Sequence, residues 1–112
     1  VIPVHNRKHY TRACLTYLRA QTYPGFMTIV VDDGSTDGTA AMLATEFPDV
    51  VVLTGSGNLW WTEATNAGVR YALQHADATG PHFVLTLNDD VQLGPDYLAQ
   101  LLATYRRHAP CV

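Results

Sequence analysis

Apolar residues are grouped along the chain in two alternating patterns, and each pattern predicts a different kind of element. Short runs that are nearly all apolar predict strands that are covered on both faces. These runs are residues 1–4, 26–31, 50–53 and 83–87. Longer segments repeat their apolar residues at helical spacing and predict helices. These segments are residues 8–21, 40–47, 62–72 and 95–105.

The predicted order is therefore βαβαβαβα, which is typical of an α/β fold. Apolar strands joined by helices favour a Rossmann-like parallel sheet with right-handed crossovers and helices on both faces. Thr62 is expected to cap the third helix, with Glu63 in its first turn. Pro95 suits the first turn of the last helix.

Composition narrows the class of protein without naming a function. The 112 residues suffice for one compact core, and a 47% apolar content with 15% charged residues is globular rather than disordered. The net charge of −3 and the scattered Lys and Arg residues argue against a nucleic-acid partner. Cys14 and Cys111 give no disulfide framework and are expected to be small apolar fillers, which favours a reducing compartment. His75 and His82 are expected on the surface.

No apolar run reaches the roughly 18 to 20 residues that a membrane span needs, and no signal peptide is visible. The chain begins inside a predicted strand, without Met, and stops just after a predicted helix. We therefore expect it to be a piece of a longer protein.

Polar side chains gather directly after the predicted strands. In parallel sheets, ligands bind beyond these carboxyl ends. The four segments concerned are His5-Asn6, residues 32–38, residues 55–61 and Asn88-Asp89-Asp90.

The segment D-D-G-S-T-D-G at residues 32–38 has two interpretations. Asp, Gly and Ser are ordinary turn residues, and Thr36 or Asp37 would cap the next helix. Alternatively, a carboxylate after a buried strand accepts a hydrogen bond from the ring N–H of a uracil or thymine. Gly34 would then let the backbone approach a flat ligand.

The loop G-S-G-N-L-W-W at residues 55–61 is not a dinucleotide fingerprint, because Trp60 stands where its last Gly belongs. At least one of Trp60 and Trp61 is expected in the core, and the other lines a ligand pocket.

Two adjacent carboxylates repel each other unless a cation lies between them. Asp89 and Asp90 therefore read either as a solvated turn or as a site for Mg²⁺ or Mn²⁺, which take one or two carboxylates plus substrate phosphates. Zinc is not expected, because the five His residues lack ligand spacing.

Four segments, taken in order and spacing, resemble the family 2 inverting glycosyltransferases, and bacterial rhamnosyltransferase-like members in particular. They are V-I-P-V-H-N-R, V-V-D-D-G-S-T-D-G-T, G-N-L-W-W-T-E-A-T-N-A-G-V and L-N-D-D-V. The resemblance covers essentially the whole chain. It implies the N-terminal, nucleotide-sugar-binding portion of a GT-A fold over residues 1–112, with strand order 3-2-1-4.

The resemblance also implies roles for individual residues. Asp90 would bind the metal, as part of a variant of the D-x-D motif. The nucleotide-binding set would be Pro3, Val4, His5, Asn6, Asp32, Asp33, Asn66, Gly68, Asn88 and Asp89. The partners implied are a UDP- or dTDP-linked sugar and a carbohydrate or lipid-linked acceptor, used in bacterial polysaccharide biosynthesis in the cytoplasm or at the inner face of the membrane.

Two positions depart from the family pattern. His5 stands where an aromatic residue is common, and Thr65 replaces the Arg of an A-R-N-x-G segment. The catalytic base of such enzymes is expected beyond residue 112, so none is assigned. The reaction implied is direct displacement by an acceptor hydroxyl at the anomeric carbon, with inversion.

Three alternatives remain open on the sequence. A receiver-like Mg²⁺-binding signalling domain needs a Lys on a later strand end, whereas the single lysine is Lys8. A haloacid-dehalogenase-type phosphatase needs D-x-D where this chain has D-D-G-S. A non-catalytic nucleotide-binding or scaffolding module fits the same residues as the enzyme.

Overall fold

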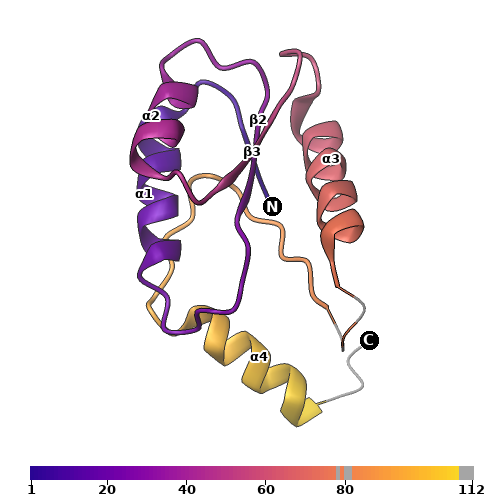
Figure 1. Ribbon diagram of the computed structural model, residues 1–112. Coiled ribbons are helices and arrows are strands. Elements are labelled where there is room, and N and C mark those ends of the chain that lie inside the picture. Colours follow the sequence, from indigo (N-terminus) through magenta and orange to yellow (C-terminus); the bar gives the residue numbers. More distant parts are fainter. Residues whose placement is uncertain (78, 80–81, 109–112) are drawn as a thin grey trace.

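The computed structural model describes residues 1–77, 79 and 82–108 as strands and helices in alternation (Figure 1). The elements are β1 (Ile2–Val4), α1 (Lys8–Arg19), β2 (Ile29–Asp32), α2 (Thr39–Glu46), β3 (Val51–Thr54), α3 (Trp60–His75) and α4 (Tyr97–His108). The predicted α/β class is confirmed.

The three strands form a parallel sheet in the order β1-β2-β3. Val30 lies opposite Ile2 on one side and Val52 on the other, so β2 is the central strand. Helices α1 and α2 cover one face of the sheet and α3 covers the other (Figure 1). All three β1 residues and all four β2 residues are buried, which explains their continuous apolar runs.

Each face of the sheet has its own apolar core. On the α1/α2 face, the buried cluster joins strand residues to both helices; it comprises Ile2, Val4, Cys14, Leu15, Leu18, Val30, Met42, Leu43 and Phe47. On the α3 face, Ile29 and Val31 pack against Ala64.

Cys14 is buried in the core of the α1/α2 face. Its pKa is raised to about 11, mainly by burial and further by repulsion from Asp89 and Asp90. Its thiol therefore stays protonated, as expected of an apolar filler; Cys111 lies outside the described residues.

The fourth predicted strand, residues 83–87, is not a regular strand. It lies beside β1 through two hydrogen bonds, from the Val1 amino group to the Leu85 carbonyl and from the Leu87 N–H to the Val1 carbonyl. This is the pattern of a parallel pair. Two residues further on, Pro3 has no N–H with which to continue the ladder. The segment therefore takes the place expected of a fourth strand in the order 3-2-1-4, but only over this short stretch.

The predicted strand at 26–31 begins too early. Its ladder starts at Ile29, opposite Val51, because β3 offers no partner before that residue. Phe26 and Met27 precede the ladder and are exposed. The strand instead extends to Asp32, so a carboxylate belongs to the buried central strand.

Helix α4 begins at Tyr97, two residues after Pro95, and contains no fully buried residue. Its predicted apolar face is only partly covered, through Leu98 on the α1/α2 core and Tyr105 edge-on to Phe83. Among the described residues, no helix has both the length and the apolar character of a membrane span.

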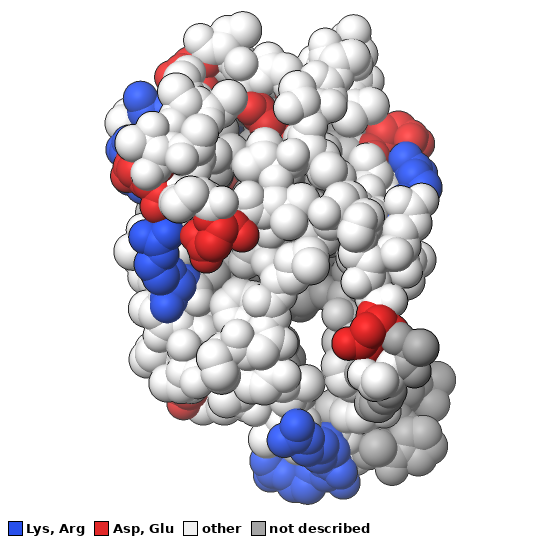
Figure 2. Space-filling model, viewed as in Figure 1, with Lys and Arg blue, Asp and Glu red and all other residues white. Residues whose placement is uncertain are grey.

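Charged side chains do not form one continuous surface in the view of Figure 2. Lys and Arg side chains lie at one edge of this face over α1, at the opposite edge beside α3, and at the end of α4, where the last turn carries Arg106 and Arg107. His75 and His82 are exposed, as the sequence predicted.

Candidate nucleotide-sugar site

A cavity of about 390 Å³ opens at the carboxyl ends of β1 and β2, and we call it the strand-end cavity. It draws residues from four separate segments of the sequence. Its lining consists of Pro3, Val4, His5, Arg7, Asp33, Gly57, Trp60, Trp61, Ala64, Asn88, Asp89 and Asp90. The structure thus brings together the predicted metal ligand Asp90 and six of the ten predicted nucleotide-binding residues: Pro3, Val4, His5, Asp33, Asn88 and Asp89.

Asp33 is buried and organises the loop between β3 and α3. Its Oδ1 accepts the N–H of Gly57 at 2.8 Å, and its Oδ2 accepts those of Leu59 and Trp60, each at 3.0 Å. Burial by itself would raise the pKa of Asp33, but these three hydrogen bonds outweigh it and lower the pKa below its ordinary value. The carboxylate is therefore ionised at neutral pH.

This arrangement corrects the prediction for the start of the third helix. The helix begins at Trp60 rather than after Thr62, because the Asp33 carboxylate from another loop satisfies the first free N–H groups. Glu63 does lie in the first turn, as predicted.

The prediction that Trp60 or Trp61 packs in the core was wrong. Trp60 is 78% exposed and Trp61 57% exposed, and both line the strand-end cavity. Trp60 has a φ of 57°, which is strained for a bulky residue, and the Asp33 carboxylate holds its N–H. Its neighbour Trp61 donates its ring Nε1–H to Asn88 Oδ1 at 3.1 Å.

The loops after β1 and β2 are tied to each other through Asn6. Its backbone N–H donates to Ser35 Oγ at 2.9 Å, and its side-chain oxygen accepts the N–H of Thr36 at 2.7 Å. Asn6 has a φ of 53°, a conformation that Asn tolerates better than most residues. Asn6 is therefore a residue that shapes the cavity wall, and it does not itself line the cavity.

His5 is fixed at the cavity by the same two loops. Its Nδ1 donates to the Asp33 carbonyl, and its Nε2 accepts from the Asn6 side-chain amide at 3.3 Å. In this pair of contacts, Nδ1 carries the proton that is donated. His5 is thereby fixed as part of the lining of the cavity.

Asp32 and Asp37 accept backbone N–H groups beside the cavity and thereby fix the local turn. Asp32 is buried, and its Oδ1 accepts the N–H of Ser35 at 3.1 Å. Asp37 accepts the N–H of Lys8 at the start of α1 and that of Thr39 at the start of α2. The turn interpretation of residues 32–38 thus holds for these two carboxylates, while Asp33 faces the cavity.

Gly34 and Gly68 are both required by close packing. A Cβ on Gly34, whose φ is 68°, would lie 2.7 Å from Gly57 Cα. A Cβ on Gly68 would lie 2.3 Å from a methyl of Val1 and 3.1 Å from one of Val31, so this glycine lets α3 approach the sheet. Gly68 and the exposed Asn66 are outside the lining of the cavity.

The two adjacent aspartates are in different surroundings. The side chain of Asp89 is 7% exposed, and that of Asp90 is 45% exposed. Burial raises the pKa of Asp89, the nearby Arg7 guanidinium partly offsets the rise, and repulsion from Asp90 adds to it. Asp90 is therefore the carboxylate that is more accessible to solvent.

The donor set fits a hard cation only in part. No group of three or more His, Cys, Asp or Glu suited to a metal exists in residues 1–77, 79 and 82–108. Two carboxylates at the edge of a cavity nevertheless suit Mg²⁺ or Mn²⁺, which complete their coordination with water and substrate phosphates.

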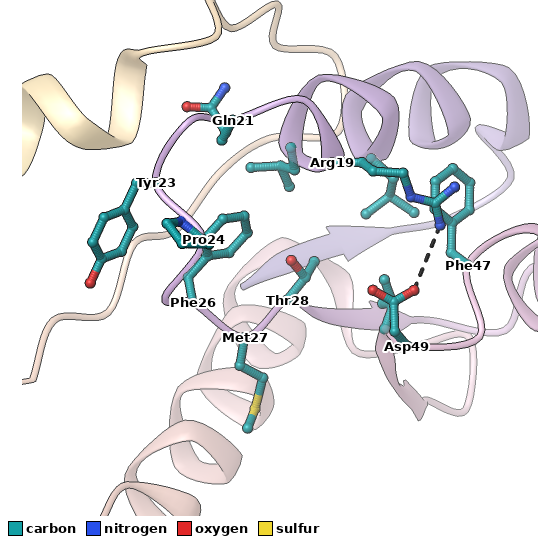
Figure 3. A pocket seen from close by; sticks show the side chains of 12 residues that line it. Arg19, Gln21, Tyr23, Pro24, Phe26, Met27, Thr28, Phe47 and Asp49 are labelled. Carbon is teal, nitrogen blue, oxygen red and sulfur yellow. Dashed lines mark ion pairs between the residues drawn. The ribbon is translucent and has the colours of Figure 1, made fainter.

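A second cavity of about 310 Å³ lies at the opposite end of the sheet, before β2. Arg19 borders it, stacked over the Phe47 ring at 4.4 Å and paired with Asp49 at 3.6 Å (Figure 3). Phe26 and Met27, which precede the β2 ladder, also line this cavity. Ligands of parallel sheets bind at the other end, so this cavity is not the candidate site.

Comparison with known proteins identifies the family. The family described as "Glycosyl transferase family 2" matches residues 1–112. The chain is 28% identical over 102 residues to the glycosyltransferase GlyA of Streptococcus pneumoniae serotype 4, and 32% identical over 91 residues to an uncharacterised glycosyltransferase of Rickettsia prowazekii. The matches include 90% and 81% of this chain but only 14% and 26% of the two relatives.

Solved structures share the fold. Residues 1–349 of TarS of S. aureus, in complex with UDP, superpose with a TM-score of 0.79 at 23% identity, over 96% of this chain and 31% of that one. The mannosyltransferase PcManGT of Pyrobaculum calidifontis, in complex with GDP-Man and Mn²⁺, gives a TM-score of 0.70 at 24% identity, over 99% and 32%.

Proposed function

The chain belongs to glycosyl transferase family 2, and we propose that the protein transfers a sugar from a nucleoside-diphosphate sugar to an acceptor hydroxyl with inversion. In this proposal, residues 1–112 form the donor-binding portion. The acceptor oxygen bonds to the anomeric carbon as the bond from that carbon to the diphosphate breaks. The acceptor proton passes to a base that we do not assign in this chain.

The observation that carries the proposal is the composition of the strand-end cavity. Its lining combines the first-strand residues and Asp33 with Asn88, Asp89 and Asp90. A nucleoside diphosphate would use both sets, because its planar base needs hydrogen-bond partners and its charged phosphates need a divalent cation held by carboxylates. The complexes of TarS with UDP and of PcManGT with GDP-Man and Mn²⁺ support this ligand class.

We assign the base to Asp33 and His5. Asp33 Oδ1 accepts a single N–H, from Gly57, and so retains one acceptor position for a ring N–H. Uracil and thymine present such an N–H, whereas cytosine presents an acceptor at the same ring position. The His5 imidazole would stack on the base. We therefore expect UDP and dTDP to bind in preference to CDP.

We assign the diphosphate to the acidic end with Asp90 as the metal ligand. A bound Mg²⁺ or Mn²⁺ supplies charge neutralisation for the departing diphosphate. Asn88 is oriented by Trp61, and Asp89 lies deeper, beside Arg7. Asp90 thus presents the accessible carboxylate that the cation needs.

Titration calorimetry of the complete protein with UDP, dTDP and CDP, each with and without Mn²⁺, tests both assignments. We expect UDP and dTDP to bind more tightly than CDP, and Mn²⁺ to raise the affinity for all three. Equal affinity for UDP and CDP would overturn the role of Asp33. Equal affinity with and without Mn²⁺ would show that the acidic pair is not a metal site.

Transfer itself is distinguished from a non-catalytic binding module by product analysis. The complete protein is incubated with labelled sugar donors and carbohydrate or lipid-linked acceptors extracted from the producing cell. The anomeric configuration of the product is then read from its NMR coupling constants. Inverted product supports the proposal; retained configuration, or nucleotide binding without any product across the donor and acceptor panel, contradicts it.

A further inference from the structure

Arg7 connects the loop after β1 to both members of the acidic pair. Its Nη1 lies 3.3 Å from Asp89 Oδ1, and its Nη2 lies 3.6 Å from Asp90 Oδ2. The guanidinium also stacks over the Tyr10 ring, 4.5 Å from its centroid. One planar cation thus lies between two carboxylates that would otherwise repel each other.

Among the described residues that line the strand-end cavity, Arg7 is the only Lys or Arg. The other charged side chains there are Asp33, Asp89 and Asp90, so the cavity has more negative than positive charge. A diphosphate entering this cavity meets like charges, and Arg7 is the side chain available to compensate them. The fork of a guanidinium suits phosphate oxygens, which it binds in a bidentate manner.

The position of Arg7 allows it to change partners. Its side chain is 43% exposed, and its two ion pairs are longer than the usual distance for a charge-assisted hydrogen bond. The pair with Asp90 is exposed on both sides, and exposed ion pairs are weak, contributing at most about 1 kcal/mol. A cation that takes Asp90 therefore breaks this pair at little cost, and the Arg7 guanidinium is then available to a ligand.

We propose that Arg7 is a diphosphate-binding residue that also competes with the metal for the acidic pair. Without a donor it bridges Asp89 and Asp90; with a donor its guanidinium binds the diphosphate and leaves Asp90 to the divalent cation. The diphosphate-binding role rests on the proposed function, which identifies the donor. The competition between Arg7 and a divalent cation for Asp89 and Asp90 does not depend on the identity of the donor.

Two binding measurements on the complete protein test the two halves of this proposal, with Arg7→Gln as the variant. Without metal, its affinity for UDP should fall roughly tenfold to a hundredfold, as expected for a lost charge-assisted contact. Without nucleotide, its affinity for Mn²⁺, read from the electron paramagnetic resonance signal of free Mn²⁺, should rise roughly threefold to tenfold because the competing cation is gone. Arg7→Lys keeps the charge and should retain part of the UDP affinity.

The matched control is Arg12→Gln. Arg12 has a similar exposure and also pairs with a carboxylate, but its partner is Glu46 and it does not line the cavity. This variant should change neither affinity. If Arg7 has only a structural role, Arg7→Gln should lower the affinities for UDP and for Mn²⁺ together. If Arg7 contributes nothing to either site, Arg7→Gln should change neither affinity. Either result overturns the proposal. If the unchanged protein binds no UDP even with Mn²⁺, the proposed function fails, while the measurement with Mn²⁺ alone still decides the competition.

Discussion

The Asp33 carboxylate accepts the backbone N–H of Trp60 at 3.0 Å and thereby holds a strained, exposed aromatic residue at the mouth of the strand-end cavity. The same carboxylate accepts the N–H groups of Gly57 and Leu59. A residue that directly follows the central strand thus fixes the loop that follows the next strand. The shape of this wall depends on the charge of one side chain.

Replacing Asp33 by Asn should loosen this loop. Asn keeps one acceptor oxygen and turns an N–H₂ group toward backbone donors, so at least one charge-assisted hydrogen bond is lost. We expect a loss of about 2 kcal/mol in local stability, seen as roughly thirtyfold faster hydrogen exchange in residues 55–61. Asp49→Asn is the control, because the Asp49 side chain is 81% exposed and distant from the loop. Unchanged exchange in Asp33→Asn would contradict the role of this carboxylate.

The effect of Asp33 should depend on pH in a defined direction. Its pKa is lowered in the folded protein, so its ionised form stabilises the fold. That contribution is complete above the ordinary carboxylate pKa of about 4, and it is lost as the pH falls through the lowered folded pKa. Hydrogen exchange in residues 55–61, compared between the unchanged protein and Asp33→Asn and corrected for the intrinsic rate at each pH, should differ most at neutral pH. The difference should shrink below pH 4, whereas a constant difference would exclude the charge as its source.

Gly68→Ala should destabilise the packing of α3 on the sheet. The new Cβ would lie 2.3 Å from a Val1 methyl and 3.1 Å from a Val31 methyl. Displacing these side chains should cost about 1 to 3 kcal/mol and lower the melting temperature. The control is Gly94→Ala, whose Cβ would meet its nearest neighbour at 3.6 Å, an ordinary contact. A melting temperature equal to that of Gly94→Ala would show that α3 moves aside freely.

Trp61→Phe removes the Nε1–H that orients Asn88 and keeps an aromatic ring in place. A neutral hydrogen bond of this kind contributes about 1 kcal/mol, so the donor KM should rise about fivefold with little change in melting temperature. Trp60→Phe is the control, since the Trp60 contact with Asp33 is made by the backbone. An equal rise in both variants would mean that ring size, and not the bond to Asn88, matters.

The sequence predicted the element order and the end of the sheet where the candidate site lies, because hydrophobic period and strand direction are local properties. Pro3 also explains, in retrospect, why the fourth strand has a short ladder. The tertiary capping by Asp33 was not predictable, because Gly57, Leu59 and Trp60 contribute backbone N–H groups that any residue would carry.

Arg7 and the tryptophans show a different limit of sequence reasoning. Arg7 lies within the V-I-P-V-H-N-R segment, but its contacts with Asp89 and Asp90 cross most of the chain. The sequence did contain a signal for this contact. Two adjacent carboxylates need a positive charge nearby, and the chain has only seven Lys and Arg residues that could supply it. Trp60 and Trp61 were assigned by the general tendency of large apolar residues to be buried, and two such residues at a binding cavity are the exception that this tendency misses.

The last prediction separates the roles of Asp90 and Asp89. Asp90 is the accessible carboxylate, whereas Asp89 is buried and paired with Arg7. If Asp90 binds the cation, Asp90→Asn keeps the shape of the side chain but removes the charge that a hard cation requires. Turnover of the complete enzyme should then fall roughly a hundredfold or more, since a metal Lewis acid contributes several kcal/mol.

Asp89→Asn should have a smaller effect on kcat, with part of its effect in the donor KM, because its carboxylate faces Arg7 rather than solvent. Both constants are measured for both variants across a Mn²⁺ series, and the Asp90→Asn defect should be partly relieved at high Mn²⁺. If both residues were only turn formers, Asn would replace either one with nearly unchanged turnover. A larger turnover defect in Asp89→Asn, or an Asp90→Asn defect that does not respond to Mn²⁺, would reverse the assignment, because the buried carboxylate would then be the one that the reaction depends on.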